Sequence, residues 1–155
     1  KIGISIYEPT ELDEICSQFA IDIIQAPLSI VDNRLEESGW LNRLSELNIE
    51  IHARSIFLQG LLLMPARKRP QKFNKWVSLW TNWDKWLNEI SLTPLQACLQ
   101  YVLSFNEINK VIVGVDSVNQ LDDIILSCNN SKIKAPKNIH CSDVNLVNPS
   151  RWQYL

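Results

Sequence analysis

Ile51-His-Ala-Arg-Ser-Ile-Phe-Leu-Gln-Gly-Leu-Leu62 and Ile112-Val-Gly-Val-Asp-Ser-Val-Asn-Gln-Leu-Asp-Asp123 are the two stretches that decide the fold. In each, a short run of strand-forming residues enters a turn and is followed by residues typical of the start of a helix. A strand that leads through a short loop into a helix is the repeating unit of parallel α/β proteins. The two stretches therefore predict two such units.

Strand and helix patterns alternate along the rest of the chain. The expected strands are 2–7, 21–25, 49–55 and 111–115, and the expected helices are 10–19, 35–47, 73–90, one from residue 93, and 117–128. Thr10, Thr93 and Ser117 stand at cap positions of these helices. From about residue 129 the periodicity is weak, which indicates an irregular tail.

Four strand–helix units in this order require a parallel sheet with right-handed crossovers. The predicted fold class is α/β: half of a TIM (β/α)8 barrel, with four parallel β/α units plus an irregular C-terminal tail. A complete barrel needs about 250 residues, and this chain has 155. We expect residues 1–129 to form the half-barrel and residues 130–155 to form a tail packed on it. A small open α/β sheet is the alternative architecture.

The composition excludes several classes of protein. The formal net charge is −2 and 46% of the residues are hydrophobic, which argues for a globular domain and against a surface for nucleic acids or anionic membranes. No apolar run is long enough for a membrane span, and no signal peptide is recognisable. The four cysteines lie far apart, without the spacing of a metal or redox site. We expect a cytoplasmic protein with reduced thiols and no metal, nucleic-acid or membrane partner.

Alternate residues of each strand point to opposite faces of the sheet. In the third strand, Ile51 and Ala53 share one face, whereas His52 and Arg54 share the other. One face is therefore apolar enough to pack on helices, and the other is small or polar. This pattern fits a barrel with a wet interior near the carboxyl ends of its strands. A sheet with one solvated face and no site is the alternative.

The four units in this order resemble the last four β/α units of the aldo/keto reductases, over about residues 1–129. Gly3-Ile4-Ser5-Ile6 is similar to the family's fifth strand, whose Ser-Asn pair holds the nicotinamide carboxamide. Ser5 matches, whereas Ile6 stands in place of the Asn. Ile24-Gln25-Ala26 is similar to the sixth strand, and the resemblance implies that Gln25 also contacts the carboxamide.

The segment after His52 is similar to the family's seventh-strand motif, Tyr-Ser-Pro-Leu-x-x-Gly-Leu-Leu. Ser55, Gln59 and Gly60 match this motif. Arg54 replaces the aromatic residue that stacks on the nicotinamide, and a planar guanidinium can stack in its turn. The resemblance therefore implies that Arg54, Ser55 and Gly60 contact the cofactor.

After its eighth strand the family carries Ile-Pro-Gly, a small or basic residue, Ser, and later Glu-Asn beside the adenine. Gly114 and Ser117 match, and Ser117 with Gln120 would cap a helix whose N-terminus faces the phosphate. Asp123 takes the place of the Glu. Asp116 falls near the position that contacts the 2′-phosphate of NADP, so its carboxylate favours NAD or no dinucleotide at all. NAD or NADP is the cofactor that the resemblance implies, bound through fewer contacts than in the family.

The catalytic Tyr, Lys, Asp and His of the family lie on its first four strands, which have no counterpart in this sequence. Acid–base catalysis needs a donor within hydrogen-bond reach of the carbonyl oxygen. His52 and Tyr7 are the candidates at strand positions, with Arg54 as an electrophile, and a structural role is the alternative for each. We assign no catalytic residue.

The resemblance implies the C-terminal half of an NAD(P)-dependent oxidoreductase that is inactive alone, as a fragment or a remnant. One alternative is a non-enzymatic half-barrel homodimer or interaction module. Another is a dinucleotide-binding half that a partner chain completes. Four parallel strands leave two edges unpaired and one face uncovered, so we expect a homodimer formed through the edges or the inner face.

Two further patterns have structural interpretations. Apolar residues recur at intervals of three and four at Phe73, Trp76, Trp80, Trp83, Leu87 and Ile90. This spacing predicts one helix face packed in the core, with an exposed interaction stripe as the alternative. The basic run Arg67-Lys68-Arg69 is expected in a solvated loop, with contact to a cofactor pyrophosphate as the alternative.

Overall fold

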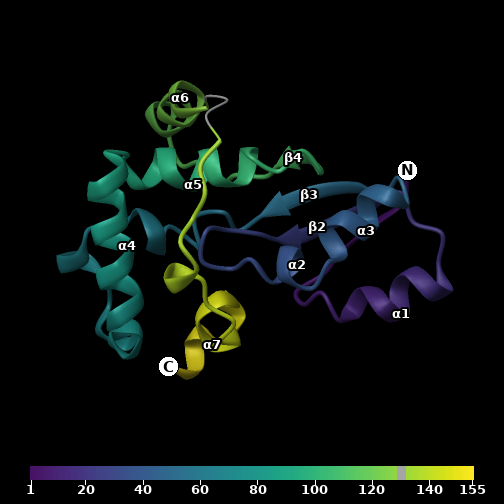
Figure 1. Ribbon diagram of the computed structural model, residues 1–155, viewed down its shortest axis with the longest axis horizontal. Helices are drawn as coiled ribbons and strands as arrows, with labels where there is room; N and C mark the ends of the chain where they lie inside the picture. Colours follow the sequence, from purple (N-terminus) through teal and green to yellow (C-terminus); the bar gives the residue numbers. More distant parts are fainter. Residues whose placement is uncertain (129–131) are drawn as a thin grey trace.

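The computed structural model describes residues 1–128 and 132–155 (Figure 1). Its centre is one parallel sheet of four strands whose order, β1-β2-β3-β4, is their order in the chain. The strands are β1 (Gly3–Ser5), β2 (Ile23–Pro27), β3 (Glu50–Arg54) and β4 (Ile108–Val111). Successive neighbours joined by helical crossovers build the curved sheet of a barrel. The predicted half-barrel of four β/α units is confirmed.

Helical segments follow every strand. They are α1 (Glu11–Gln18) after β1, α2 (Arg34–Glu37) and α3 (Trp40–Glu46) after β2, α4 (Val77–Ile90) and α5 (Pro94–Leu103) after β3, α6 (Val118–Ser127) after β4, and α7 (Val144–Val147). Short 3₁₀ segments are Leu61–Leu63, Ala66–Lys68, Gln71–Trp76, Lys137–Ile139 and Pro149–Tyr154. None of the helices in the described part of the chain has the length and apolarity to cross a membrane.

The bounds of several expected elements differ, and two of these differences have a visible cause. The helix expected at 35–47 is split by Gly39, whose φ of 80° separates α2 from α3. The fourth strand lies earlier than expected, because the chain leaves the sheet after Ile112, whose N–H still donates to the carbonyl of Ala53 at 2.8 Å. The apolar residues from Val113 onward line a cleft instead of extending the strand.

The helix starts show which capping signals are effective. Thr93 accepts from the N–H of Gln96 at 3.2 Å, and the Gln96 side chain accepts from the N–H of Thr93 at 3.0 Å, as a capping box requires. Thr10 makes no side-chain cap. There the carboxylate of Glu11 accepts from the N–H groups of Tyr7 and Glu8, at 2.8 and 2.6 Å.

In β2 and β3 the two faces of the sheet differ as the alternation predicts, whereas all three residues of β1 are exposed. Ile24, Ala26, Ile51 and Ala53 are fully buried on one face. Ile24, Ala26 and Ile51 pack in one core with residues of α1, α2 and α3. Ala53 belongs to a second, larger core that includes residues of α4 and α5. Gln25 and the alternate residues of β3 are only half-buried, on the face that the helices leave open.

The aromatic face expected at 73–90 is packed in the core and runs from the 3₁₀ segment Gln71–Trp76 into α4. Phe73, Trp76, Trp80, Trp83 and Leu87 are all at least nine-tenths buried, and Ile90 packs against them at the end of the helix. The predicted core packing of this face is confirmed. Trp86 is also buried, which the spacing did not indicate.

The tail packs on the larger core (Figure 1). The ring of Trp152 meets Phe73 edge to face with centroids 4.7 Å apart. The N–H of Cys141 donates to the carbonyl of Val31 at 2.8 Å, just after β2. The division proposed between residues 129 and 130 lies outside the described residues, so it stays a prediction.

Candidate functional site

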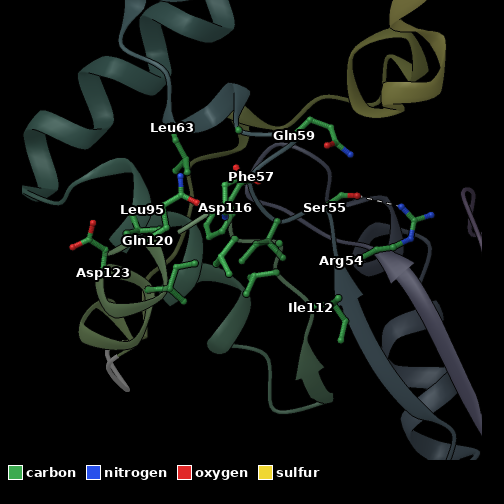
Figure 2. Close-up of a pocket in the computed structure, with 16 residues that line it drawn as sticks. Arg54, Ser55, Phe57, Gln59, Leu63, Leu95, Ile112, Asp116, Gln120 and Asp123 are labelled. Atoms are coloured by element: carbon green, nitrogen blue, oxygen red, sulfur yellow. Dashed lines mark hydrogen bonds between the residues drawn. The ribbon is translucent and has the colours of Figure 1, made fainter. Parts of the chain in front are cut away.

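A cleft of about 750 Å³ lies where β3 and β4 end and α6 begins (Figure 2). Parallel α/β folds carry their sites at the carboxyl ends of the strands. Six of the nine residues that the resemblance assigned to the cofactor line this cleft: Arg54, Ser55, Gly60, Gly114, Gln120 and Asp123. Gln59 and Asp116 line it too. Ser117 caps the helix that forms one wall, whereas Ser5 and Gln25 lie outside the cleft.

The loop after β3 has an unusual backbone. Ser55, Leu58, Gln59 and Gly60 have φ values of 60°, 48°, 53° and 79°. Each of the three side-chain-bearing residues in the left-handed region costs about 1 kcal/mol. Leu58 is buried, and its N–H donates to the carbonyl of Ser55 at 2.9 Å. The fold therefore holds a strained loop that places Ser55 and Gln59 at the cleft.

The N-terminus of α6 forms the opposite wall. The N–H of Gln120 donates to Oγ of Ser117 at 3.2 Å, as predicted. The side-chain oxygen of Gln120 accepts from the N–H of Asp116 at 2.8 Å. A capping box would use the N–H of Ser117, which is the next residue. Asp116 and Asp123 are both exposed, so this wall presents carboxylates to the cleft.

Apolar side chains also line the cleft. Phe57, Leu63 and Leu95 line it, and sequence reasoning missed all three. Leu95 belongs to α5 and comes to the cleft only through the packing of α5 between β4 and α6. Nothing in its local sequence separates it from an ordinary core leucine. Phe57 stands within the quoted stretch, two residues after Ser55, where its place in the cleft could have been suspected.

Arg54 lies at the end of β3 with its guanidinium over the ring of Tyr7, 4.7 Å from the centroid. It donates to the carbonyl of Ile6 at 2.8 Å and to Oγ of Ser55 at 3.2 Å. The ring of Tyr7 is therefore a support for Arg54. This contact favours the structural interpretation of Tyr7 over a catalytic one.

Ser5 and Gln25 lie on the open face of the sheet. The strand register places Ser5 beside Gln25, Gln25 beside His52, and His52 beside Lys110. The four residues form a polar row across all four strands. His52 of this row is two residues before Arg54 in β3, so the two side chains point to the same face. A ligand that extends from the cleft over the sheet would therefore meet the row.

A charged cluster occupies the amino-terminal side of this row. Nε2 of His52 lies 2.8 Å from the carboxylate of Glu50, Nζ of Lys110 lies 3.4 Å from it, and Lys1 also pairs with it. The hydrogen bonds from His52 and Lys1 lower the pKa of Glu50 from 4.5 to about 2. His52 does not line the cleft. Its pairing with Glu50 favours the structural interpretation of His52.

The basic run does not reach the cleft. Arg67 and Lys68 are exposed, and Arg69 donates to both carboxylate oxygens of Asp84 on α4, at 3.0 and 2.6 Å. Among residues 1–128 and 132–155, no group of three or more His, Cys, Asp or Glu side chains is placed to hold a metal ion.

Comparisons with known proteins relate the chain to one family of enzymes. The model of the aldo/keto reductase family matches residues 1–140. The aldo-keto reductase AKR11C1 from Bacillus halodurans, holo form, has a TM-score of 0.65 and 22% identity, over 88% of this chain and 48% of that chain. Its apo form gives a TM-score of 0.64 and 22% identity, over 88% and 47%. This chain thus spans about half the length of the solved structures it matches, and no curated protein matches it.

Proposed function

The chain belongs to the aldo/keto reductase family, and on that premise we propose that it is the cofactor-binding C-terminal half of a cytoplasmic NAD(P)-dependent oxidoreductase. The observation that carries the proposal is the cleft at the ends of β3 and β4, which gathers six of the residues assigned to the cofactor. The cofactor supplies the hydride for carbonyl reduction. The catalytic Tyr, Lys, Asp and His would come from a complementary half-barrel.

The polar groups of the cleft suit a dinucleotide. Ser55, Arg54 and the N-terminus of α6 are donors for a diphosphate. Asp116 and Asp123 can accept hydrogen bonds from ribose hydroxyls, and they would repel a 2′-phosphate. We therefore propose NAD as the preferred cofactor.

Catalysis would need a proton donor that this cleft does not carry. Its lining, drawn from the described residues, contains two carboxylates and one guanidinium but no Tyr, His, Lys or Cys. General acid catalysis at neutral pH needs a group whose pKa lies near the working pH. We therefore propose that the chain binds the dinucleotide but does not reduce a carbonyl compound without a partner.

A titration with NADH and NADPH tests the proposal. Transfer of excitation from the six tryptophans to bound NADH would report binding. We expect saturation at micromolar NADH and weaker binding of NADPH. Absence of binding at millimolar NADH would sink the proposal.

A matched pair of variants locates the binding. Asp116→Lys should improve the affinity for NADPH relative to NADH, because it replaces a repulsive charge in the cleft with an attractive one. Asp122→Lys makes the same charge change on α6 at a residue that does not line the cleft, and it should leave the ratio unchanged. Equal effects from both variants would contradict a site at Asp116.

A second candidate function is assembly, with the chain as a half-barrel homodimer or interaction module. The observation that favours it is an exposed apolar stripe on α6 made of Val118, Leu121, Ile125 and Leu126. β4 is the last strand of the sheet, and its outer edge has no strand neighbour among the described residues. A free strand edge and an exposed apolar helix face are both surfaces on which a further β/α unit could pack.

Sedimentation at micromolar concentration tests the assembly. A homodimer would have twice the mass of one chain, 17.9 kDa, and Leu126→Glu should dissociate it. The mass of a single chain would count against the homodimer. Dinucleotide binding by a monomeric chain would then leave the first candidate standing alone.

A further inference from the structure

The arginine at the end of β3 makes its hydrogen bonds and its ring contact with neutral groups. The guanidinium of Arg54 contacts the ring of Tyr7, the carbonyl of Ile6 and the hydroxyl of Ser55. Its Nε is buried and has no hydrogen-bond partner within the described part of the chain. Buried guanidinium groups are normally paired with an anion, since leaving a buried charge unpaired is costly.

Other arginines that lie partly inside the fold do have such a partner. Arg34 donates to both carboxylate oxygens of Asp32, at 2.7 and 2.9 Å, and Arg69 does the same to Asp84. Asp32 lies close enough to Arg54 for an electrostatic interaction. Both carboxylate oxygens of Asp32, however, already accept hydrogen bonds from Arg34. Within residues 1–128 and 132–155, Arg54 forms no ion pair with a carboxylate.

The cleft itself has opposite charges on its two sides. Arg54 is the one cationic residue among those lining it, at the end of β3. Figure 2 shows Asp123 and Gln120 on the far side of the cleft from Arg54 and Ser55, with Asp116 between them. The side-chain charges of the cleft therefore draw an entering anionic group toward Arg54 and away from Asp116 and Asp123.

We propose that Arg54 is the oxyanion-binding residue of the cleft, and that its guanidinium with the hydroxyl of Ser55 binds a phosphate or carboxylate group. The inference deepens the proposed function, since it rests on the same cleft and names the ligand group held at its β3 end. The planar guanidinium offers the paired N–H donors that phosphate and carboxylate oxygens accept. The ring of Tyr7 lies against the guanidinium.

Calorimetric titration with inorganic pyrophosphate and with oxalate tests the proposal on the intact chain. Arg54→Gln should weaken binding of at least one of them by about 10-fold or more, because it removes a charge-assisted hydrogen bond. Arg54→Lys keeps the charge without the planar fork, and it should retain only part of the affinity. Circular dichroism tests whether each variant is folded. If Arg54→Gln does not fold, Arg54→Lys still tests the proposal.

Arg43→Gln is the matched control. Arg43 also lies over an aromatic ring, that of Trp40 at 4.2 Å, but it is exposed on α3 and does not line the cleft. Its variant makes the same change of charge and should bind both anions as the unmodified chain does. Equal weakening in Arg43→Gln and Arg54→Gln would overturn the proposal, because it would show a general effect of net charge.

The two probes and NADH separate the sources of the oxyanion. If Arg54→Gln weakens pyrophosphate and NADH together, Arg54 holds the diphosphate of the cofactor. If it weakens oxalate and leaves NADH unchanged, Arg54 holds the carboxylate of an acidic carbonyl substrate. Anion binding without NADH binding would sink the proposed function and leave the role of Arg54 standing. Unchanged binding of both anions in folded Arg54→Gln, or no binding by the unmodified chain at millimolar concentration, would overturn that role.

Discussion

α4 and α6 are both amphipathic helices, but they bury different shares of their apolar surface. In α4 the apolar side chains Leu79, Trp80, Trp83, Trp86 and Leu87 all face the core. In α6 only Ile124 is a buried apolar residue. The α6 stripe is exposed, with Leu126 at 82% and Val118 at 72% of their full accessible surface.

The difference arises because other described parts of the chain cover the apolar face of α4 but not that of α6. The tail and α5 cover α4, whereas nothing in the described residues covers the outer face of α6. An exposed contiguous apolar stripe on a soluble domain usually marks an interaction surface. α4 therefore stabilises this chain, and α6 carries the exposed surface on which we propose that a further β/α unit packs.

Among the variants that test this comparison, Trp83→Ala should cause the largest loss of stability. Trp83 is fully buried in α4, so its truncation should lower the free energy of unfolding by about 3–5 kcal/mol. Chemical denaturation monitored by circular dichroism measures the loss. The control on α6, Leu126→Ala, should change the same quantity by less than about 0.5 kcal/mol.

Trp83→Phe refines this result. Nε1 of Trp83 is buried without a hydrogen-bond partner in the described part of the chain, and an unpaired buried N–H costs about 1–3 kcal/mol. Phe keeps most of the ring and removes the unpaired group, so its loss of stability should be clearly smaller than that of Ala. Equal losses for Phe and Ala would contradict the assignment of the α4 effect to buried apolar area.

Asp84→Ala tests how the preceding loop is fastened to α4. Arg69 donates to both oxygens of Asp84 and lies over the ring of Trp80 at 5.0 Å, with only 7% of its side chain exposed. Because Asp84 is itself 41% exposed, solvent screening reduces the loss, which should be about 1–2 kcal/mol. Asp122→Ala removes the same type of side chain from the exposed face of α6 and should cost less than about 0.5 kcal/mol. Similar losses from both would show that the Arg69 pair contributes nothing specific.

Local patterns predicted much of this architecture. The alternation in Glu50–Arg54 placed Ile51 and Ala53 on the buried face, because residue parity fixes the face once a strand forms. The spacing of the tryptophans predicted the buried face of α4 for the same kind of reason. The Thr93 capping box was also predictable, since its two hydrogen bonds join residues only three positions apart.

Features that depend on long-range packing were not predictable. Periodicity shows that α6 has an apolar stripe but not whether another element covers it. The left-handed backbone at Ser55 and Gln59 was hidden because neither residue is a glycine. The structure places Ser5 and Gln25 on the open sheet face outside the cleft, and their contact with a cofactor stays a prediction.

The caps of α5 and α6 provide a smaller test of the same contrast. Thr93→Ala and Ser117→Ala each remove a side-chain acceptor from a helix start, which costs about 1 kcal/mol. In α5, which is buried, the loss should appear in global unfolding. In α6 it should appear as faster hydrogen exchange of the first turn, with little change in global stability. Thr93→Ser, which keeps the acceptor, is the control, and a global loss from Ser117→Ala would contradict the peripheral role of α6.

Leu126→Glu should have the smallest effect on the isolated chain and is the sharpest test of what the α6 stripe does. Leu126 is exposed, so a charge there should change the free energy of unfolding by less than about 0.5 kcal/mol. The same charge would be buried if another β/α unit packed on the stripe, and sedimentation should then show weaker association. Thr81→Glu adds an equal charge to the exposed face of α4, where it should alter neither stability nor association. A large loss of stability in Leu126→Glu would mean that the stripe already packs within the chain, and the contrast between α4 and α6 would fail.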